Sequence, residues 1–390
     1  MDAIYLDHAA TTPMHPEVIK VMTSLMEDTF GNPSSIHHYG RKARAQLDKA
    51  RRYIAHSISA HEKDIYFTSG GTEADNLALI GVALANQTKG NHIITTKIEH
   101  HGILRTAEYL ESIGFEVSYL PVNSVGLVDP EAVKQALRPD TILVSIMFIN
   151  NEVGSIQPIK QIGQLLADHQ AYFHTDAVQA YGLLPIDVTE LGVNLLSASA
   201  HKINGPKGVG FLYAQKGIKL QAMQFGGSQE RLKRAGTEGL PGIMGMKKAI
   251  ELIEQSSYQC YAHYQELREL FYQQLVQAGI DFKVNGVLKN SSPTILNLSF
   301  PNTHVESVLM NLDLEGIAAS SGSACTAGSL ESSHVLTAMY GKDDARTRNS
   351  IRFSFGLANN REQVIEAADR VVKIIKRLVN QSEKHKDGDL

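Results

Sequence analysis

The sequence contains very little cysteine. Its 390 residues include two cysteines, Cys260 and Cys325. Two thiols allow at most one disulfide bond within the chain, and they cannot form a cysteine zinc cluster or an iron–sulfur site. The sequence therefore excludes a disulfide-rich scaffold, and we expect no resident metal.

Long apolar segments and an excess of one charge are also missing. No run of about 18 apolar residues could span a bilayer, and 37 Lys plus Arg against 41 Asp plus Glu give a formal net charge of −4. We therefore expect no membrane contact and no direct nucleic-acid partner. The first residues, Met1-Asp2-Ala3-Ile4, lack the basic and apolar segments of a secretory signal. We expect a cytoplasmic protein in which Cys325 is a free thiol.

Short apolar segments alternate with amphipathic ones through the first two thirds of the chain. This order is typical of an α/β fold in which helices cover a mainly parallel sheet. Seven strands are predicted, namely Ile65–Thr68, His92–Thr96, Glu116–Leu120, Thr141–Ile146, Tyr172–Thr175, Leu195–Ser199 and Val209–Tyr213.

The last third has a different pattern, which predicts a smaller α+β domain. A long polar helix from about Lys247 to Ala278 is followed by strands at Ser292–Ser299 and Ile351–Phe355 and by a helix at Glu362–Val379. At roughly 150 residues per domain the length allows two or three domains. We predict a large domain over residues 15–258 and a small domain made of residues 1–14 and 259–390.

Ligands of open α/β sheets bind beyond the carboxyl ends of the strands, so the loops after the predicted strands deserve inspection. The segment Ser69-Gly70-Gly71-Thr72-Glu73 follows the first of them. Glycines allow close approach of the backbone, and the start of the next helix offers unpaired N–H groups that suit a phosphate. A plain turn with Thr72 as the N-cap explains the same residues.

A carboxylate and a lysine follow two other predicted strands. Asp176 comes after Tyr172–Thr175, where it could cap the next helix or act in a site, because a buried carboxylate is costly unless paired. Lys202 comes after Leu195–Ser199 and next to His201. Such a lysine can reach into a cleft and form an imine, or it can lie at the surface.

The two cysteines have different surroundings. Cys325 lies among small residues, in Ser320–Ser329, which predicts an exposed and mobile thiol. Cys260 lies on a predicted helix among aromatic residues, so we expect it to be a structural residue of the core.

Together, these features suit pyridoxal phosphate. Lys202 can bond the aldehyde as an imine, Asp176 can keep the pyridine nitrogen protonated, and the Gly71-Thr72 turn can bind the phosphate. His100, in the adjacent pair His100-His101, belongs to no zinc motif and can serve the same site.

These motifs resemble those of the NifS/IscS class of cysteine desulfurases, which are fold-type I pyridoxal phosphate enzymes. The resemblance covers nearly the whole chain. The segment Ile98-Glu99-His100-His101 is similar to the branch that supplies a tRNA 2-thiouridine synthase. The matching motifs are Tyr5–Pro13, Phe30–Ser35, Phe67–Glu73, Asn150–Gly154, Ser199–Lys202, Arg234–Thr237 and Ser321–Thr326.

The resemblance implies a role for each residue of the site. Lys202 would bond the cofactor, His100 would stack on its ring and move protons, and Cys325 would be the nucleophile. The remaining residues would contact the cofactor's ring or phosphate, or would bind the substrate carboxylate. They are Gly71, Thr72, Asp176, Gln179, Ser199, His201 and, across a dimer interface, Thr237 for the cofactor, Asn151 for both cofactor and substrate, and Arg352 for the substrate.

The implied reaction converts L-cysteine to L-alanine and leaves the sulfur on Cys325 as a persulfide. The implied partners are a second copy of the chain and a sulfur acceptor, either a tRNA 2-thiouridine synthase or an iron–sulfur scaffold. Two alternatives remain open. One is another fold-type I pyridoxal phosphate enzyme, such as an aminotransferase or a selenocysteine lyase, with Cys325 incidental. The other is a non-catalytic nucleotide-binding or scaffold protein.

Overall fold

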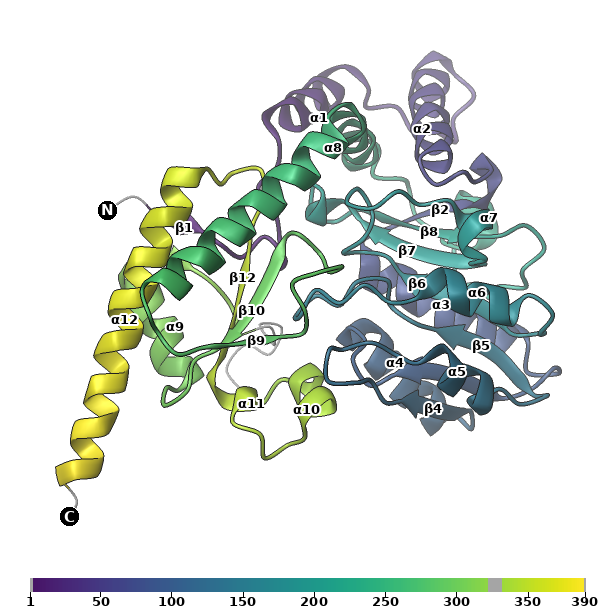
Figure 1. Ribbon diagram of the computed structural model, residues 1–390. Helices are drawn as coiled ribbons and strands as arrows, with labels where there is room; N and C mark the ends of the chain where they lie inside the picture. Colours follow the sequence, from purple (N-terminus) through teal and green to yellow (C-terminus); the bar gives the residue numbers. More distant parts are fainter. Residues whose placement is uncertain (1–2, 322–331, 389–390) are drawn as a thin grey trace.

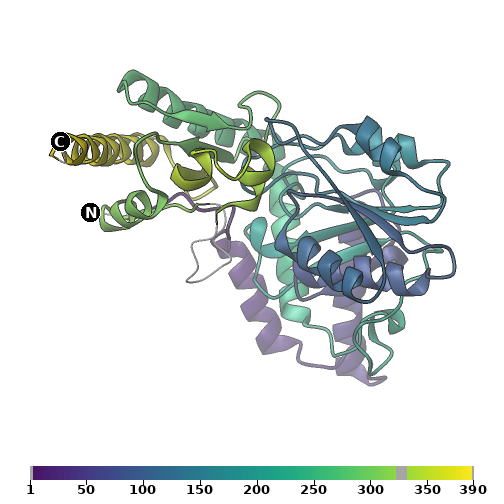
Figure 2. The same cartoon turned by 90° about the horizontal axis from the view of Figure 1, so that it is seen from below.

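A computed structural model describes residues 3–321 and 332–388. Figure 1 shows two parts, one in blue and teal and the other in green and yellow. The first is built on a seven-stranded sheet and the second on a three-stranded sheet. In Figure 2 the yellow helix α12 (Arg361–Gly388) lies on the side of the second part that faces away from the large sheet.

The seven-stranded sheet has the order β2-β8-β7-β6-β5-β3-β4. β8 runs antiparallel to both of its neighbours, and the remaining pairs are parallel. This mainly parallel sheet confirms the predicted α/β fold class. The strands are β2 (Ile65–Thr68), β3 (His92–Thr96), β4 (Glu116–Leu120), β5 (Thr141–Ser145), β6 (Tyr172–Asp176), β7 (Leu195–Ser199) and β8 (Gly210–Ala214).

Helices cover both faces of this sheet because its central strands carry apolar side chains on both sides. Leu196 of β7 points into the core beneath α2, whereas its neighbour Leu195 points to the opposite face, which α3 and α4 cover. Alternate side chains of a strand point to opposite faces, so each strand contributes to both cores. The covering helices are α2 (His38–His56), α3 (Gly71–Ala85), α4 (His101–Ser112), α5 (Pro130–Ala136), α6 (Ile159–Leu166) and α7 (Val188–Leu191).

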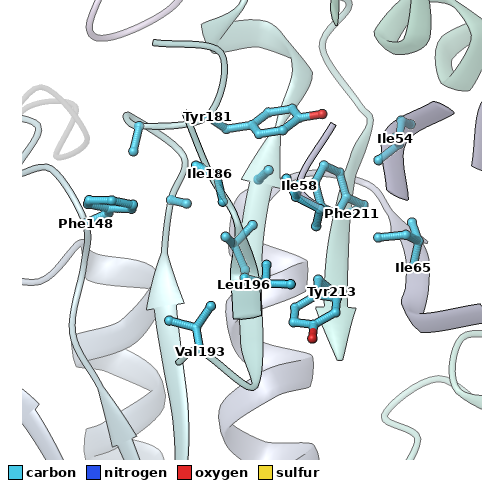
Figure 3. Close-up of a cluster of buried hydrophobic side chains, with 14 of the residues drawn as sticks. Ile54, Ile58, Ile65, Phe148, Tyr181, Ile186, Val193, Leu196, Phe211 and Tyr213 are labelled. Carbon is cyan, nitrogen blue, oxygen red and sulfur yellow. The ribbon is translucent and has the colours of Figure 1, made fainter. Parts of the chain in front are cut away.

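The core beneath α2 is closely packed. Figure 3 shows Phe211 beside Ile58, with the ring of Tyr181 above them and Leu196 below. The rings of Tyr181 and Phe211 meet edge to face with centroids 5.2 Å apart. This packing fixes β7 and β8, and with them the loop that follows β7.

The second part is an antiparallel sheet with the order β12-β10-β9. The predicted strand Ser292–Ser299 begins three residues late, at Ile295, because Pro293 has no N–H for a sheet ladder. The predicted helix Glu362–Val379 extends to Gly388. The remaining elements are β1 (Ile4–Tyr5), β9 (Lys283–Asn285), β10 (Ile295–Ser299), α9 (Val305–Leu314), β11 (Ile317–Ala318), α10 (His334–Tyr340), α11 (Arg346–Asn349) and β12 (Ser350–Ser354).

Helix α8 (Leu240–Gln277) joins the two parts, and α1 (Pro16–Asp28) packs against its first half. Leu240 to Ile250 contribute to the core of the large sheet, whereas Leu267 to Leu275 contribute to the second core. Ile4 and Leu6 also belong to the second core. These contacts support our proposal that residues 1–14 and 259–390 form one domain and residues 15–258 the other. None of the described helices is both long and apolar enough to cross a membrane.

Candidate active site

A cavity of about 250 Å³ lies where the carboxyl ends of several strands meet. The connections after β2, β3, β6 and β7 contribute to its lining, and β12 of the second part contributes Arg352. The predicted site residues that line it are Gly71, Thr72, His100, Asn151, Asp176, Gln179, Ser199, His201, Lys202 and Arg352. Of the other two, Cys325 lies outside the described residues, and Thr237 is exposed and does not line this cavity.

One end of the cavity is the start of α3. Gly70 is its N-cap residue, and no side chain caps the helix. Thr72 lies within the first turn, so the alternative in which Thr72 is the N-cap is wrong. A Cβ atom at Gly71 would lie 2.6 Å from Cγ2 of Val178, so any larger residue there would force Val178 to move. The uncapped N–H groups of this 15-residue helix can bind a phosphate.

Ser199 and His201 lie beside this end of the cavity. Ser199 ends β7 and is buried, and Nδ1 of His201 lies 3.1 Å from the hydroxyl of Thr11. Burial and the charge of Lys202 lower the pKa of His201 to about 4. His201 is therefore a neutral hydrogen-bonding group at physiological pH.

Lys202 follows β7 in the short 3₁₀ helix η2 (Ala200–Lys202). Its amine donates to the backbone carbonyls of Ala9 and Ala10, the latter at 2.7 Å. Gln179 donates to the same carbonyl of Ala9 at 2.9 Å. The N-terminal segment therefore holds both side chains at the cavity, a contact that no local feature of the sequence indicates.

Asp176 is the last residue of β6 and is 5% exposed. Its Oδ1 accepts a hydrogen bond of 2.9 Å from the backbone N–H of Val178. Turns rather than a helix follow in the described chain, so the alternative of a helix N-cap is wrong. Burial raises the pKa of Asp176 to about 6, against the opposing effects of that N–H and of Lys202.

His100 is the N-cap residue of α4, and its Nδ1 accepts from the backbone N–H of Gly102 at 3.0 Å. Burial, and to a smaller extent the charge of Lys202, lower the pKa of His100 to about 4. The ring is therefore neutral. Since Nδ1 accepts a hydrogen bond, the ring proton is assigned to Nε2.

Arg352 brings the second part of the molecule to the cavity. Its side chain is 2% exposed, and it donates to Oδ1 of Asp7 at 2.7 Å and to the carbonyl of Asn151 at 2.9 Å. Its Nε is buried and makes no hydrogen bond with the described residues. This N–H can donate to a carboxylate in the cavity.

Two buried carboxyl groups near the cavity were missed from the sequence. Asp75 on α3 is 1% exposed, and Glu99 after β3 is fully buried. Burial is the main cause that raises the pKa of Glu99, to about 8. The sequence signal for Asp75 was an acidic residue among the small and apolar residues of a helix.

Thr237 lies on an exposed segment that is tied to the cavity from outside. Arg234 of this segment forms an ion pair of 2.8 Å with Glu73 in the first turn of α3. Glu73 also accepts from the N–H of Ser69 at 2.8 Å. The segment is therefore fixed to the turn that can bind a phosphate, although Thr237 itself does not line this cavity.

The expectation that Cys260 is a core residue is wrong. Cys260 is half-buried and lines a cavity of about 430 Å³ beside α8, and it also lines a smaller one together with Lys202 and Gln179. Its Sγ lies 3.3 Å from the hydroxyl of Ser256. The aromatic neighbours in the sequence did not reveal that α8 crosses between two cores at this point.

A family model described as aminotransferase class-V matches residues 4–366. The chain belongs to this family. A Bacillus subtilis (strain 168) member named IscS 1 is 56% identical over 97% of this chain and 100% of its own length. A Dictyoglomus turgidum protein named cysteine desulfurase IscS is 49% identical over 96% of this chain and 95% of its own length.

A solved structure of this class-V fold, described as a NifS-like protein, superimposes with a TM-score of 0.90. It is 35% identical, and the match covers 96% of this chain and 99% of that one. These matches confirm the predicted resemblance to cysteine desulfurases, the fold class, and a pyridoxal phosphate-dependent enzyme. They do not test the role of any single residue.

Proposed function

We propose that the protein is a cysteine desulfurase that transfers the sulfur of L-cysteine to Cys325. One observation carries the proposal: Lys202 and Asp176, from neighbouring strands, and Arg352, from the second part of the molecule, line the same cavity. The names of the class-V relatives support it. A solved structure titled "SspA in complex with cysteine", 36% identical with a TM-score of 0.80, supports the choice of substrate.

The cavity fits pyridoxal phosphate. Its lining includes Lys202, the buried Asp176 and the uncapped start of α3. When bound, the cofactor supplies an aldehyde that takes up the amino acid and a ring that withdraws electrons from it. Lys202 would bond that aldehyde, Asp176 would hold a proton on the pyridine nitrogen, and Gln179 would donate to the ring hydroxyl. The phosphate would lie against Gly71, Thr72, Ser199 and His201.

Arg352 and Asn151 would bind the substrate carboxylate. The buried Nε of Arg352 has no partner among the described residues, whereas both of its other nitrogens are already directed by Asp7 and the Asn151 carbonyl. A carboxylate that accepts from Nε therefore meets a guanidinium that is already oriented. The neutral ring of His100 would move the proton at the substrate's α-carbon.

Cys325 would receive the sulfur. The segment that contains it follows Ser320, whose backbone N–H and C=O both bond to the backbone of Arg352. The segment therefore starts beside the residue that would hold the substrate. In the balanced step, L-cysteine and the Cys325 thiol give L-alanine and a Cys325 persulfide. The thiolate must be the attacking form, because a thiol is a poor nucleophile.

A homodimer would complete the site. Several large apolar side chains are exposed on two segments of the large-sheet part, and Thr237 follows the second segment. Isolated exposed apolar residues are ordinary, but a concentration of them marks an interaction surface. These residues are Met26, Phe30, Ile36, Tyr39, Met223, Phe225 and Leu232, with Ile36 90% and Phe225 81% exposed. A second copy that covers them could present Thr237 to the partner's phosphate site.

The acceptor would be a protein of tRNA thiolation, a tRNA 2-thiouridine synthase, or an iron–sulfur scaffold. The motif around His100 supports the first. We place the reaction in the cytoplasm, where thiols stay reduced and a persulfide can be passed on.

The direct test is to incubate the purified, cofactor-loaded protein with L-cysteine and a thiol reductant. The proposal predicts alanine and sulfide in equal amounts, and no sulfide from the Lys202→Ala variant. Formation of a keto acid without sulfide would instead show an aminotransferase. Sulfide released without catalytic turnover, or no release of sulfide at all, would contradict the proposal.

A further inference from the structure

Asp75 differs from the other buried carboxyl groups near the cavity. Asp176 accepts from the N–H of Val178, and Glu99 accepts from the N–H of Met147 and the hydroxyl of Thr96. The hydroxyl of Ser197 is the one donor that opposes the raised pKa of Asp75, and no hydrogen bond within normal distance and angle reaches either oxygen from the described residues, although the side chain is 99% buried and lines the cavity. A buried carboxylate with so little hydrogen bonding is costly, and burial favours the protonated form.

A second carboxyl group lies close to it. Oxygens of Asp75 and Asp176 and a ring nitrogen of His100 all lie within 4.8 Å of one another. Two buried carboxylates at this separation cannot both ionise at low cost, so one of them keeps a proton.

The other groups around Asp75 supply little compensating charge. His174 approaches it to 3.8 Å, but burial lowers the pKa of His174 to about 3, so this ring is neutral, as is His100. The charge of Lys202 lowers the pKa of Asp176, and its amine donates to the carbonyls of Ala9 and Ala10. The titratable groups that face Asp75 come from the segment after β3, from β6 and from η2, and they are Glu99, His100, His174, Asp176 and Lys202.

We propose that Asp75 and Asp176 share one proton and that Asp75 holds it. The negative charge then stays on Asp176, at the position that faces the cofactor nitrogen. Asp75 is thus a positioning residue, which acts on the cofactor through Asp176. This inference depends on the proposed function only for the identity of the cofactor.

The asymmetry between the two carboxyl groups has a physical cause. Asp176 has a backbone donor, Val178, and the charge of Lys202 to stabilise its anion, and its pKa is about 6. Burial and the charge of Asp176 raise the pKa of Asp75 well above its ordinary value, with the hydroxyl of Ser197 opposing that shift. The pair therefore loses its first proton from Asp176 and its second from Asp75.

Linkage gives the sign of the effect on stability. A carboxyl group whose pKa is raised on folding stabilises the native state at low pH, and this stability is lost as pH rises toward the folded-state pKa. Asp75→Asn keeps the shape of a neutral carboxyl group and removes the titration. The variant should therefore gain thermal stability relative to the wild type as pH rises.

The experiment uses the full chain without cofactor and compares the thermal midpoints of wild type, Asp75→Asn, Asp176→Asn and the double variant from about pH 5 to about pH 9. We expect Asp75→Asn to raise the midpoint at the alkaline end, with a difference that shrinks toward pH 5. Asp176→Asn removes the neighbouring charge but leaves the burial of Asp75, so it should give a smaller alkaline gain, and the double variant should match or exceed Asp75→Asn. Asp313→Asn, an exposed position on α9, is the matched control and should show no such pH dependence.

A difference between Asp75→Asn and the wild type that stays the same at every pH would overturn the proposal. A second measurement needs no substitution. Infrared spectra of wild-type protein labelled with ¹³C at the aspartate carboxyl carbons should contain the carbonyl stretch of an un-ionised carboxyl group at neutral pH, and its absence would also overturn the proposal. Neither measurement requires turnover, so a protein that shows both signatures but releases no sulfide would contradict the proposed function and leave the shared proton intact.

Discussion

Arg352 donates from Nη2 to Oδ1 of Asp7 at 2.7 Å, although the two residues are 345 positions apart in the chain. The contact joins the N-terminal segment to β12 at the edge of the cavity. It also fixes the guanidinium in a buried position where a charge-assisted hydrogen bond to a substrate carboxylate is strong.

Arg352→Lys should therefore raise KM for L-cysteine. A lysine cannot form the fork that contacts Asp7, Asn151 and the substrate together. Loss of one charged hydrogen bond, about 1.5–3 kcal/mol, corresponds to a rise of roughly 10- to 150-fold. Steady-state kinetics measure it, and Arg348→Lys, an exposed position on α11, is the control. An unchanged KM would show that Arg352 does not bind the substrate carboxylate.

Lys202→Ala should abolish covalent attachment of pyridoxal phosphate. Borohydride reduction followed by mass spectrometry of peptides should label the wild type at Lys202 and leave the variant unlabelled, because an imine needs this amine. The matched control is Lys207→Ala, an exposed lysine five positions away, which should label like the wild type. Labelling of the Lys202→Ala protein in equal amount would contradict the assignment.

Binding of pyridoxal phosphate should weaken below about pH 6. The pKa of Asp176 is about 6, so its anion exists above that pH and is lost as pH falls through it. Because the anion would hold the pyridinium, affinity should fall by up to about tenfold per pH unit below that point. Fluorescence titration of the full chain measures this, and Asp176→Asn should bind weakly at every pH. If the wild type bound pyridoxal phosphate equally well above and below this pKa, Asp176 would not be the partner of the ring nitrogen.

Phe225→Glu should shift the protein from dimer to monomer. Phe225 is 81% exposed, and a buried unpaired carboxylate at an interface is costly. Sedimentation velocity measures the oligomeric state. Leu314→Glu, at a position 78% exposed on α9, introduces the same charge away from these segments and should leave the dimer intact. A wild type that sediments as a monomer would rule out the homodimer altogether.

The strands and the main cofactor residues were predictable because their signals are local. The bounds of β2, β3, β4 and β7 match the prediction, since each is a short apolar run between polar segments. Lys202 and Asp176 could be located at strand ends for the same reason. Once both strand ends were placed at one edge of a sheet, the combination of an amine and a carboxylate there indicated pyridoxal phosphate.

The remaining features depend on contacts between distant residues. The partners of Lys202 are the carbonyls of Ala9 and Ala10, and a carbonyl carries no sequence signal. Asp75 looked like an ordinary polar position of a helix, because periodicity does not show that both sides of α3 are covered. Cys260 was misplaced because local apolar neighbours cannot show where a helix leaves one core and has not yet entered the next.

The most direct test of the account is the location of the persulfide sulfur. Cofactor-loaded protein incubated with L-cysteine without reductant should gain one sulfur atom, and peptide mass spectrometry should find it on Cys325. Cys260→Ser should behave like the wild type, whereas Cys325→Ser should keep the bound cofactor but gain no sulfur and release no sulfide catalytically. Undiminished sulfide release by Cys325→Ser, or a persulfide on Cys260 instead, would contradict the central claim.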